Sequence, residues 1–288
     1  MLIAIPTYGR AHKQRTWDRI PHELKRNTIL VIQSREYEAY KKYEKNLVVL
    51  PPEIKDIAST RDYIIDYTAN FNASVVMCDD DLDFATRLPH PNTLFRESNE
   101  DDVAAMFMHL QIALQTYVHV GVSAREGANR VTENWLYNTR AIRVTGYQPE
   151  VLRKHKIRFR DLQFMEDFHV TLSLLKLGYP NAVLNMYCHN QPGSNTVGGC
   201  SGQRTAANQE AAARKLAELH APFVTVVEKK TKTSWGGKER YDVRIQWKKA
   251  YEFAVANRSD PTFEVLDGGT GKDTDAEGKR ETEAMERK

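Results

Sequence analysis

A chain of 288 residues can hold one large α/β domain or two small ones. The hydrophobic share of 41% is enough for a proper core, the charged share of 27% is ordinary for a soluble protein, and the net charge of +3 predicts no general affinity for polyanions. Three cysteines without a CxxC pair argue against a disulfide framework or a structural zinc site. The N-terminus lacks a signal-peptide pattern and no apolar run approaches the ~20 residues that span a bilayer, so we expect a soluble, cytoplasmic protein.

In the first part of the chain, short apolar runs alternate with polar or charged segments. The runs are Leu2–Ile5, Thr28–Ile32, Leu47–Leu50 and Val75–Cys78. A segment of helical periodicity, from Glu53 to just before Asn72, separates the third run from the fourth. Strand–helix alternation of this kind predicts right-handed βαβ units and a mostly parallel sheet flanked by helices.

The second part of the chain is less regular. A capping sequence at Ser98–Asp102 precedes an amphipathic helix, and another helix is predicted at Phe168–Leu177, ending at Gly178. The remaining predicted elements are strands at 118–122, 141–144 and 182–187 and a helix at 205–220. Residues 267–288 are charged and Gly-rich with almost nothing apolar, which predicts a disordered tail.

The fourth apolar run ends in three consecutive carboxylates, Asp79, Asp80 and Asp81, and Asp83 follows two residues later. Like charges packed this tightly repel one another, so the cluster is costly unless a cation lies among them. Oxygen ligands favour Mg²⁺ or Mn²⁺, and the carboxyl ends of strands are the usual ligand sites in open α/β sheets. The plainer interpretation is an acidic, solvated turn.

Three further segments carry candidate functional groups. The first strand ends in the turn Pro6–Arg10, which offers a hydroxyl, an aromatic ring and an Arg. Glu166 and Asp167 lie between apolar residues at the predicted start of a helix, where carboxylates are also favoured by the helix dipole alone. His189 follows a predicted strand and precedes a Gly-rich loop, as either a ligand or a structural histidine.

Taken in order, these segments resemble a GT-A-type glycosyltransferase over residues 1–205. In that superfamily the Asp-x-Asp motif, here Asp79-Asp80-Asp81, holds a divalent metal that bridges the diphosphate of a nucleotide sugar. The resemblance therefore implies Mn²⁺ or Mg²⁺ and a UDP-sugar donor. It also implies one domain over residues 1–266, with a nucleotide-binding half at 1–83 and a mixed acceptor half at 84–266.

The same resemblance assigns roles to single residues. The positions that match the nucleotide-binding set are Pro6, Thr7, Tyr8, Arg10, Arg61 and Asp80, although Arg61 and its neighbour Asp62 also suit a solvated ion pair. Asp167, with Glu166 beside it, matches the acidic residue at the acceptor face, which is the base in inverting members. His189 matches a metal-binding histidine, with His169 as a competitor, and Gly198–Gly202 matches a flexible lid. The three aspartates leave the metal register open between Asp79/Asp81 and Asp81/Asp83.

Within this superfamily the chain is similar to the phage TET-associated glycosyltransferases, which modify 5-hydroxymethylcytosine in DNA. Residues 153–160 contain five Lys or Arg, and residues 229–249 contain eight, interleaved with aromatic residues. Both stretches suit DNA, and both are also compatible with solvated faces. Base flipping would need a wedge, for which Trp135 and Tyr137 are candidates. If the protein is phage-encoded, its location is the host cytoplasm.

Other functions stay open on the sequence alone. The acceptor of a GT-A transferase can instead be a glycan or a protein. An Asp-x-Asp phosphohydrolase is disfavoured because its nucleophilic pair usually ends the first strand, whereas Asp79–Asp81 follow the fourth. A non-catalytic nucleic-acid-binding module with a structural cation is the alternative from another class. The donor sugar, the anomeric outcome and the oligomeric state are not predicted.

Overall fold

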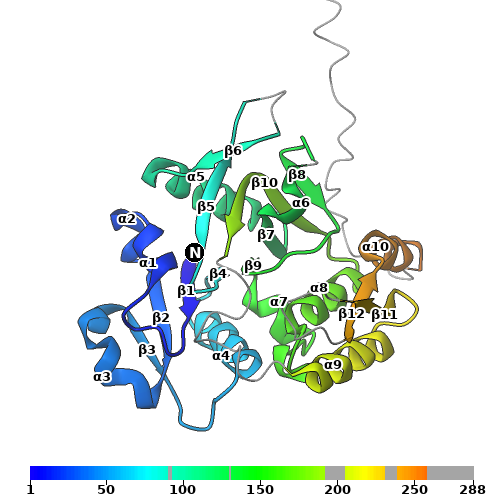
Figure 1. Cartoon of the computed structure of the whole chain (residues 1–288), viewed down its shortest axis with the longest axis horizontal. Coiled ribbons are helices and arrows are strands. Elements are labelled where there is room, and N and C mark those ends of the chain that lie inside the picture. The colour runs from blue at the N-terminus through cyan, green and yellow to red at the C-terminus, as the bar shows by residue number, and fades with distance from the viewer. Residues whose placement is uncertain (90–92, 130, 192–204, 231–238, 258–288) are drawn as a thin grey trace, which may run out of the picture. The chain divides into compact units, whose positions relative to one another are not determined.

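The computed structural model describes residues 1–89, 93–129, 131–191, 205–230 and 239–257. A ten-stranded sheet runs in the order β3-β2-β1-β4-β9-β7-β10-β5-β6, with β8 paired to β10, and β11 and β12 form a separate hairpin (Figure 1). The strands are β1 (Leu2–Pro6), β2 (Thr28–Gln33), β3 (Leu47–Leu50), β4 (Val75–Cys78), β5 (Asp83–Arg87), β6 (Phe95–Glu97), β7 (His119–Ala124), β8 (Trp135–Tyr137), β9 (Val144–Tyr147), β10 (Asn181–Asn190), β11 (Val224–Lys230) and β12 (Glu239–Ile245).

The helices connect these strands and cover the sheet. They are α1 (Arg15–Arg19), α2 (His22–Lys25), α3 (Tyr37–Tyr40), α4 (Ile57–Ala69), α5 (Glu100–Ala113), α6 (Arg125–Ala128), α7 (Pro149–Lys154), α8 (Glu166–Lys176), α9 (Ala206–Leu219) and α10 (Trp247–Ala256), with short 3₁₀ turns η1 (Ser34–Glu36), η2 (Lys41–Asn46) and η3 (Phe159–Asp161). Among the described helices, none is long and apolar enough to cross a membrane.

The predicted α/β class and its parallel first part are confirmed. Strands β3, β2, β1 and β4 pair in parallel, in the order expected of successive βαβ units. Beyond β4 the sheet is mixed, because β9 pairs antiparallel with both β4 and β7, whereas β7 and β10 are parallel. The parallel strands therefore bring the segments after β1 and β4 to one edge of the sheet.

The two faces of the sheet bury separate cores. Ile3 and Ile5 of β1 point to the face covered by α1 and α5, while Ala4 points to the face covered by α4, α7 and α8 (Figure 1). Strand β4 alternates in the same way, with Val76 on the first face and Met77 on the second. All four residues of β4 are buried, which explains why its sequence is apolar throughout.

Most predicted elements appear close to their predicted positions. Asn99 and Asp102 form a reciprocal capping box at the start of α5, and Gly178, with φ of 77°, follows α8. The strand predicted at 141–144 was wrong, because β9 begins only at Val144. Arg143 adopts a left-handed conformation (φ 62°), which breaks the extended backbone just before the strand. The predicted tail at 267–288 lies outside the described residues.

Helices α9 and α10 and the β11–β12 hairpin share a small core with α8. Leu172 and Leu175 of α8 pack with Leu216 of α9, Phe223 and Ala250. The N-terminal end of α8, which carries Glu166 and Asp167, is therefore held between the main sheet and this additional layer.

Candidate functional site

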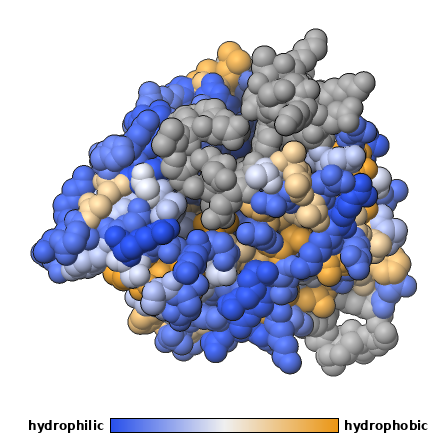
Figure 2. All heavy atoms as spheres, turned by 60° about the horizontal axis from the view of Figure 1, so that its bottom comes forward, coloured by the Kyte–Doolittle hydropathy of each residue, from blue (hydrophilic) through white to orange (hydrophobic). Residues whose placement is uncertain are grey.

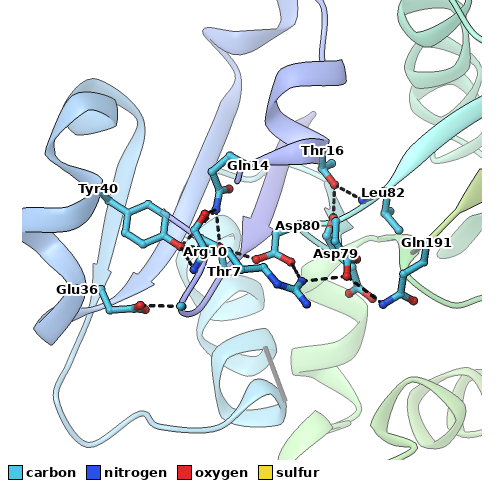
Figure 3. Close-up of polar contacts among 12 residues, drawn as sticks. Thr7, Arg10, Gln14, Thr16, Glu36, Tyr40, Asp79, Asp80, Leu82 and Gln191 are labelled. Atoms are coloured by element: carbon cyan, nitrogen blue, oxygen red, sulfur yellow. Dashed lines mark hydrogen bonds and ion pairs between the residues drawn. The ribbon is translucent and has the colours of Figure 1, made fainter. Parts of the chain in front are cut away.

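The turn after β1 and the aspartates after β4 lie next to each other at the carboxyl edge of the sheet (Figure 3). Thr16, at the start of α1, donates its hydroxyl to the Asp79 carbonyl (2.5 Å) and accepts from the Leu82 backbone N–H (2.9 Å). These bonds fix the acidic turn against the first helix. The prediction that both segments share one site is consistent with this arrangement.

Asp80 binds the turn after β1 directly. One carboxylate oxygen accepts from the Thr7 hydroxyl (2.6 Å), and the other pairs with the Arg10 guanidinium. Gln14 donates to the Thr7 oxygen (2.8 Å), and the Tyr40 hydroxyl contacts that oxygen at 2.8 Å. Burial raises the pKa of the Asp80 carboxyl to about 6, against the Thr7 hydrogen bond and the Arg10 charge. Asp80 is thus committed to holding this turn.

Asp81 has one carboxylate oxygen engaged and one available. Its Oδ2 accepts from Arg10 Nη1 (3.0 Å) and from Gln191 Nε2 (3.1 Å) just beyond β10. Its Oδ1 is buried and has no hydrogen-bond partner among the described residues. A buried carboxylate oxygen left without a partner is costly, and it points to a missing ligand.

Arg61 of α4 joins the acidic turn to the start of α8. Its Nη2 donates to Asp79 (3.1 Å) and its Nη1 donates to Glu166 (2.8 Å). Burial raises the pKa of Asp79 despite the Arg61 charge, and that side chain keeps 30% of its surface exposed. The alternative of a solvated Arg61–Asp62 pair was wrong, because Asp62 is buried and instead accepts from the Phe159 N–H (2.8 Å).

Asp167 lies beside this ion-pair chain without being part of it. Its Oδ1 accepts from the following Phe168 N–H (2.9 Å), and its side chain is half-buried. Its negative charge acts on both Arg61 and Asp79. Met165, in a left-handed conformation (φ 63°), turns the chain into α8 immediately before the two acids. Of the two carboxylates, Glu166 is the buried partner of Arg61, and Asp167 is the more accessible group.

The two candidate histidines occupy different environments. His189 lies in β10 between Phe84 of β5 and Ala124 of β7, is fully buried, and has its pKa lowered to about 3 by burial. His169 instead contacts His220 (2.9 Å), between α8 and the end of α9. Neutral imidazole is the metal-binding form, but no group of three His, Cys, Asp or Glu that would hold a metal occurs in the part of the chain that the structure describes.

The acidic turn nevertheless fits a divalent cation in a coarser sense. Mg²⁺ is commonly held by one or two carboxylates and completed by substrate phosphates and water. Asp79 and the unpartnered Oδ1 of Asp81 supply such oxygens. Asp83 is less suited, because it pairs with Arg15 and, at 3.0 Å, with Arg19 of α1. Arg10 and Arg61 also offset part of the negative charge, so the cluster is less frustrated than its sequence suggests.

The outer rim of the site is aromatic and basic. Tyr8 is 41% exposed and lies under the Arg35 guanidinium, 4.9 Å from the ring centre, with a 2.7 Å hydrogen bond to its hydroxyl. Glu36 accepts from the Gly9 N–H (2.7 Å) and so holds the turn from outside. Pro6, at the end of β1, is buried beneath it. The exposed Tyr8 ring offers a stacking surface for a planar base.

Several site residues had no signal in the sequence. Gln14, Thr16, Tyr40 and Gln191 all contact the turn or the aspartates, yet each comes from a segment without a recognisable motif. The amide of Gln191 reaches Asp81 across 110 positions of sequence. Only alignment of related sequences or a structure reveals contacts of this kind.

The two basic stretches differ from their appearance in sequence. Within 153–160, Arg160 pairs with Asp62 and Arg158 pairs with Asp66, so part of the positive charge is neutralised internally. Within 229–249, Lys229 pairs with Asp242, while Arg244, Lys248 and Lys249 are exposed. Residues 231–238 of that stretch, and the predicted Gly198–Gly202 lid, lie outside the described residues. Trp135 is only half-buried in edge strand β8, and Tyr137 is 38% exposed.

Comparison with known families decides the broader assignment. The family model described as TET-Associated Glycosyltransferase matches residues 1–199. The chain belongs to this family. The matched region contains every site residue discussed above, from the Pro6–Arg10 turn to Gln191, and the resemblance inferred from the motifs is confirmed.

Solved structures of other families are more distantly similar. Mannose-1-phosphate geranyltransferase from Thermus thermophilus has 12% identity and a TM-score of 0.36, covering 60% of this chain and 64% of its own, so this chain spans less than two thirds of it. CMP:2-keto-3-deoxy-manno-octonic acid synthetase has 11% identity and a TM-score of 0.40, covering 75% and 98%. 4-Diphosphocytidyl-2C-methyl-D-erythritolsynthase from Anaerococcus prevotii DSM 20548 has 12% identity and a TM-score of 0.37, covering 76% and 96%. No curated protein matches the chain in sequence.

Proposed function

We propose that the protein transfers a sugar from a UDP-sugar to the hydroxymethyl group of 5-hydroxymethylcytosine in DNA, with the help of Mn²⁺ or Mg²⁺. Family membership supports glycosyl transfer. The observation that carries the proposal is the Arg61 bridge, which links Asp79 of the acidic turn to Glu166 at the start of α8. Groups suited to a donor and a carboxylate suited to an acceptor are thereby fixed in one site.

On the donor side, each part of the nucleotide sugar has a candidate partner. The base would stack on Tyr8, and Thr7 and Arg10 would fix the turn that faces the ribose and phosphates. Asp79 and Asp81 would hold the cation, with His189 as a further candidate that needs a shift of β10 or of the turn. When bound, the ion supplies positive charge to the diphosphate leaving group.

On the acceptor side, Asp167 is the proposed base. In an inverting reaction its carboxylate takes the proton of the acceptor hydroxyl while that oxygen forms a bond to the anomeric carbon. The bond from the anomeric carbon to the diphosphate oxygen breaks, and UDP departs with the electron pair. Glu166 is paired with Arg61 and is proposed to position α8 instead of accepting the proton.

The direct test is to incubate the purified protein with a panel of nucleotide sugars and hydroxymethylated DNA, with and without Mn²⁺ or Mg²⁺. The DNA is then digested to nucleosides for mass spectrometry. A nucleoside heavier by one hexosyl or related sugar unit is expected only with hydroxymethylated DNA and metal, and not with Asp167→Asn. Sugar transfer to a glycan or protein but not to DNA would overturn the acceptor. DNA binding without hydrolysis of any UDP-sugar would favour a non-catalytic binding module.

A further inference from the structure

A ladder of aromatic side chains runs along α4, away from the site. Tyr63, Tyr67 and Phe71 are spaced four residues apart, so they lie on one side of the helix and its end. The Tyr63 and Tyr67 rings are stacked at 6.3 Å with an angle of 18°, and Phe71 meets Tyr67 edge-on at 5.2 Å. Phe71 is 63% exposed, an unusual position for a large apolar ring without a partner surface.

Two arginines from another segment face this ladder. Arg153 at the end of α7 and Arg158 beyond it both contact the Asp66 carboxylate, at 3.9 Å and 2.9 Å. Together these side chains form an open groove of about 380 Å³, lined by Tyr63, Asp66, Tyr67, Asn70, Arg153 and Arg158. The groove is separate from the residues around Asp79 and Glu166.

The composition of the groove favours a nucleic acid. Aromatic rings that stack on bases, combined with cations that pair with phosphates, are the usual surface for a single strand. Arg153 and Arg158 keep 45% and 33% of their side chains exposed, and such solvated ion pairs exchange readily for a phosphate. The side of the molecule at the bottom of Figure 1 is mainly hydrophilic in Figure 2, which suits a charged partner better than an apolar one.

We infer that the groove between α4 and α7 binds a strand of the DNA acceptor a few nucleotides away from the base that receives the sugar. The inference rests on the proposed function for the identity of the DNA. Arg61, in the site, and Tyr67, in the groove, are six residues apart on α4, which corresponds to about 9 Å along the helix axis. That distance is close to the span of three stacked nucleotides at about 3.4 Å each.

Three variants test the groove by binding of a fluorescein-labelled, hydroxymethylated single strand over a range of salt concentrations. Phe71→Ala removes an exposed ring and should weaken binding about 5-fold or more. Arg158→Ala should weaken binding and reduce the slope of log K against log salt by about 0.7. Asp66→Asn should act in the opposite direction, tightening binding and steepening the slope, because it releases both arginines. The control Ile112→Ala truncates a side chain that is 54% exposed on α5, on the other face of the sheet.

The outcomes separate the groove from the proposed function. Hydrolysis of UDP-sugar without acceptor should be unchanged in all groove variants. If the wild type transfers sugar to DNA but Phe71→Ala and Asp66→Asn bind DNA like the control, the groove inference is wrong and the function stands. If no sugar reaches DNA but these variants still shift strand binding in opposite directions, the function is wrong and the groove stands. Full displacement of the strand by dCMP alone would show a mononucleotide site and overturn the inference.

Discussion

The Arg61 bridge offers the sharpest test of how the site is held together. Arg61 and Glu166 keep only 9% and 10% of their side chains exposed, whereas Asp79 keeps 30%. Replacing Arg61 with Met leaves the Glu166 carboxylate buried without its partner, and removal of one member of a buried ion pair costs about 3–5 kcal/mol. Because Asp79 regains solvation more easily, we expect a loss near the lower end, about 3 kcal/mol in the free energy of unfolding.

Urea unfolding followed by circular dichroism measures this loss, and its pH dependence identifies the cause. Without Arg61, the pKa values of Glu166 and Asp79 rise, so the folded variant binds more protons than the folded wild type. The deficit should therefore be largest near neutral pH and shrink as the pH falls. The double variant Arg61→Met/Glu166→Gln should recover much of the stability but no transfer activity, since the bridge to Asp79 remains lost.

The matched control is Arg214→Met, which removes an Arg–Glu210 pair on the surface of α9. Both members of that pair are largely solvated, so the free energy of unfolding should change little. A loss for Arg61→Met no larger than that of the control would refute the bridge as a stabilising element. A loss that does not vary with pH would refute its electrostatic origin.

The remaining predictions concern the acidic turn, the base and a buried histidine. Asp81→Ala should abolish metal-dependent transfer with an unchanged circular dichroism melting curve, whereas Asp83→Asn should retain transfer; the reverse pattern would move the metal register. Asp167→Asn should lower kcat by about 10²–10⁴-fold with little change in KM for the donor, and wild-type kcat would exclude it as the base. Burial lowers the pKa of His119 to about 4 from an ordinary 6.5, so about 3 kcal/mol of stability, present above pH 6.5, should be lost as the pH falls towards 4. His119→Phe should flatten that part of the stability profile measured by urea unfolding, and a profile parallel to the wild type would contradict the assignment.

The first part of the fold was predictable because its signals are local. The apolar runs at β1 to β4 and the helical period before β4 specify strands and helix within a few residues of their observed bounds. Their alternation then specifies parallel pairing, and parallel pairing specifies the edge at which Thr7 and Asp80 meet. The location of the acidic turn therefore followed from the sequence alone.

The partners within the site were not predictable, because they depend on distant segments. Arg61 and Glu166 are 105 positions apart, and nothing near either residue indicates the other. Asp62 looked equivalent to Arg61 in sequence, but on the helix it faces the Phe159 backbone instead. The start of β9 was missed for a different reason, since the left-handed backbone of Arg143 carries no sequence signal in a non-glycine residue.

The acidic cluster has different functions at each position because its members have different neighbours. Asp80, the middle residue, holds the Thr7–Arg10 turn, so it anchors the nucleotide side without being available as a ligand. Asp83 is occupied by arginines of α1. That leaves Asp79, whose charge Arg61 only partly offsets, and Asp81, whose Oδ1 has no partner among the described residues. The contacts therefore favour the Asp79/Asp81 register, in which the middle aspartate organises the turn and the outer two face the cation.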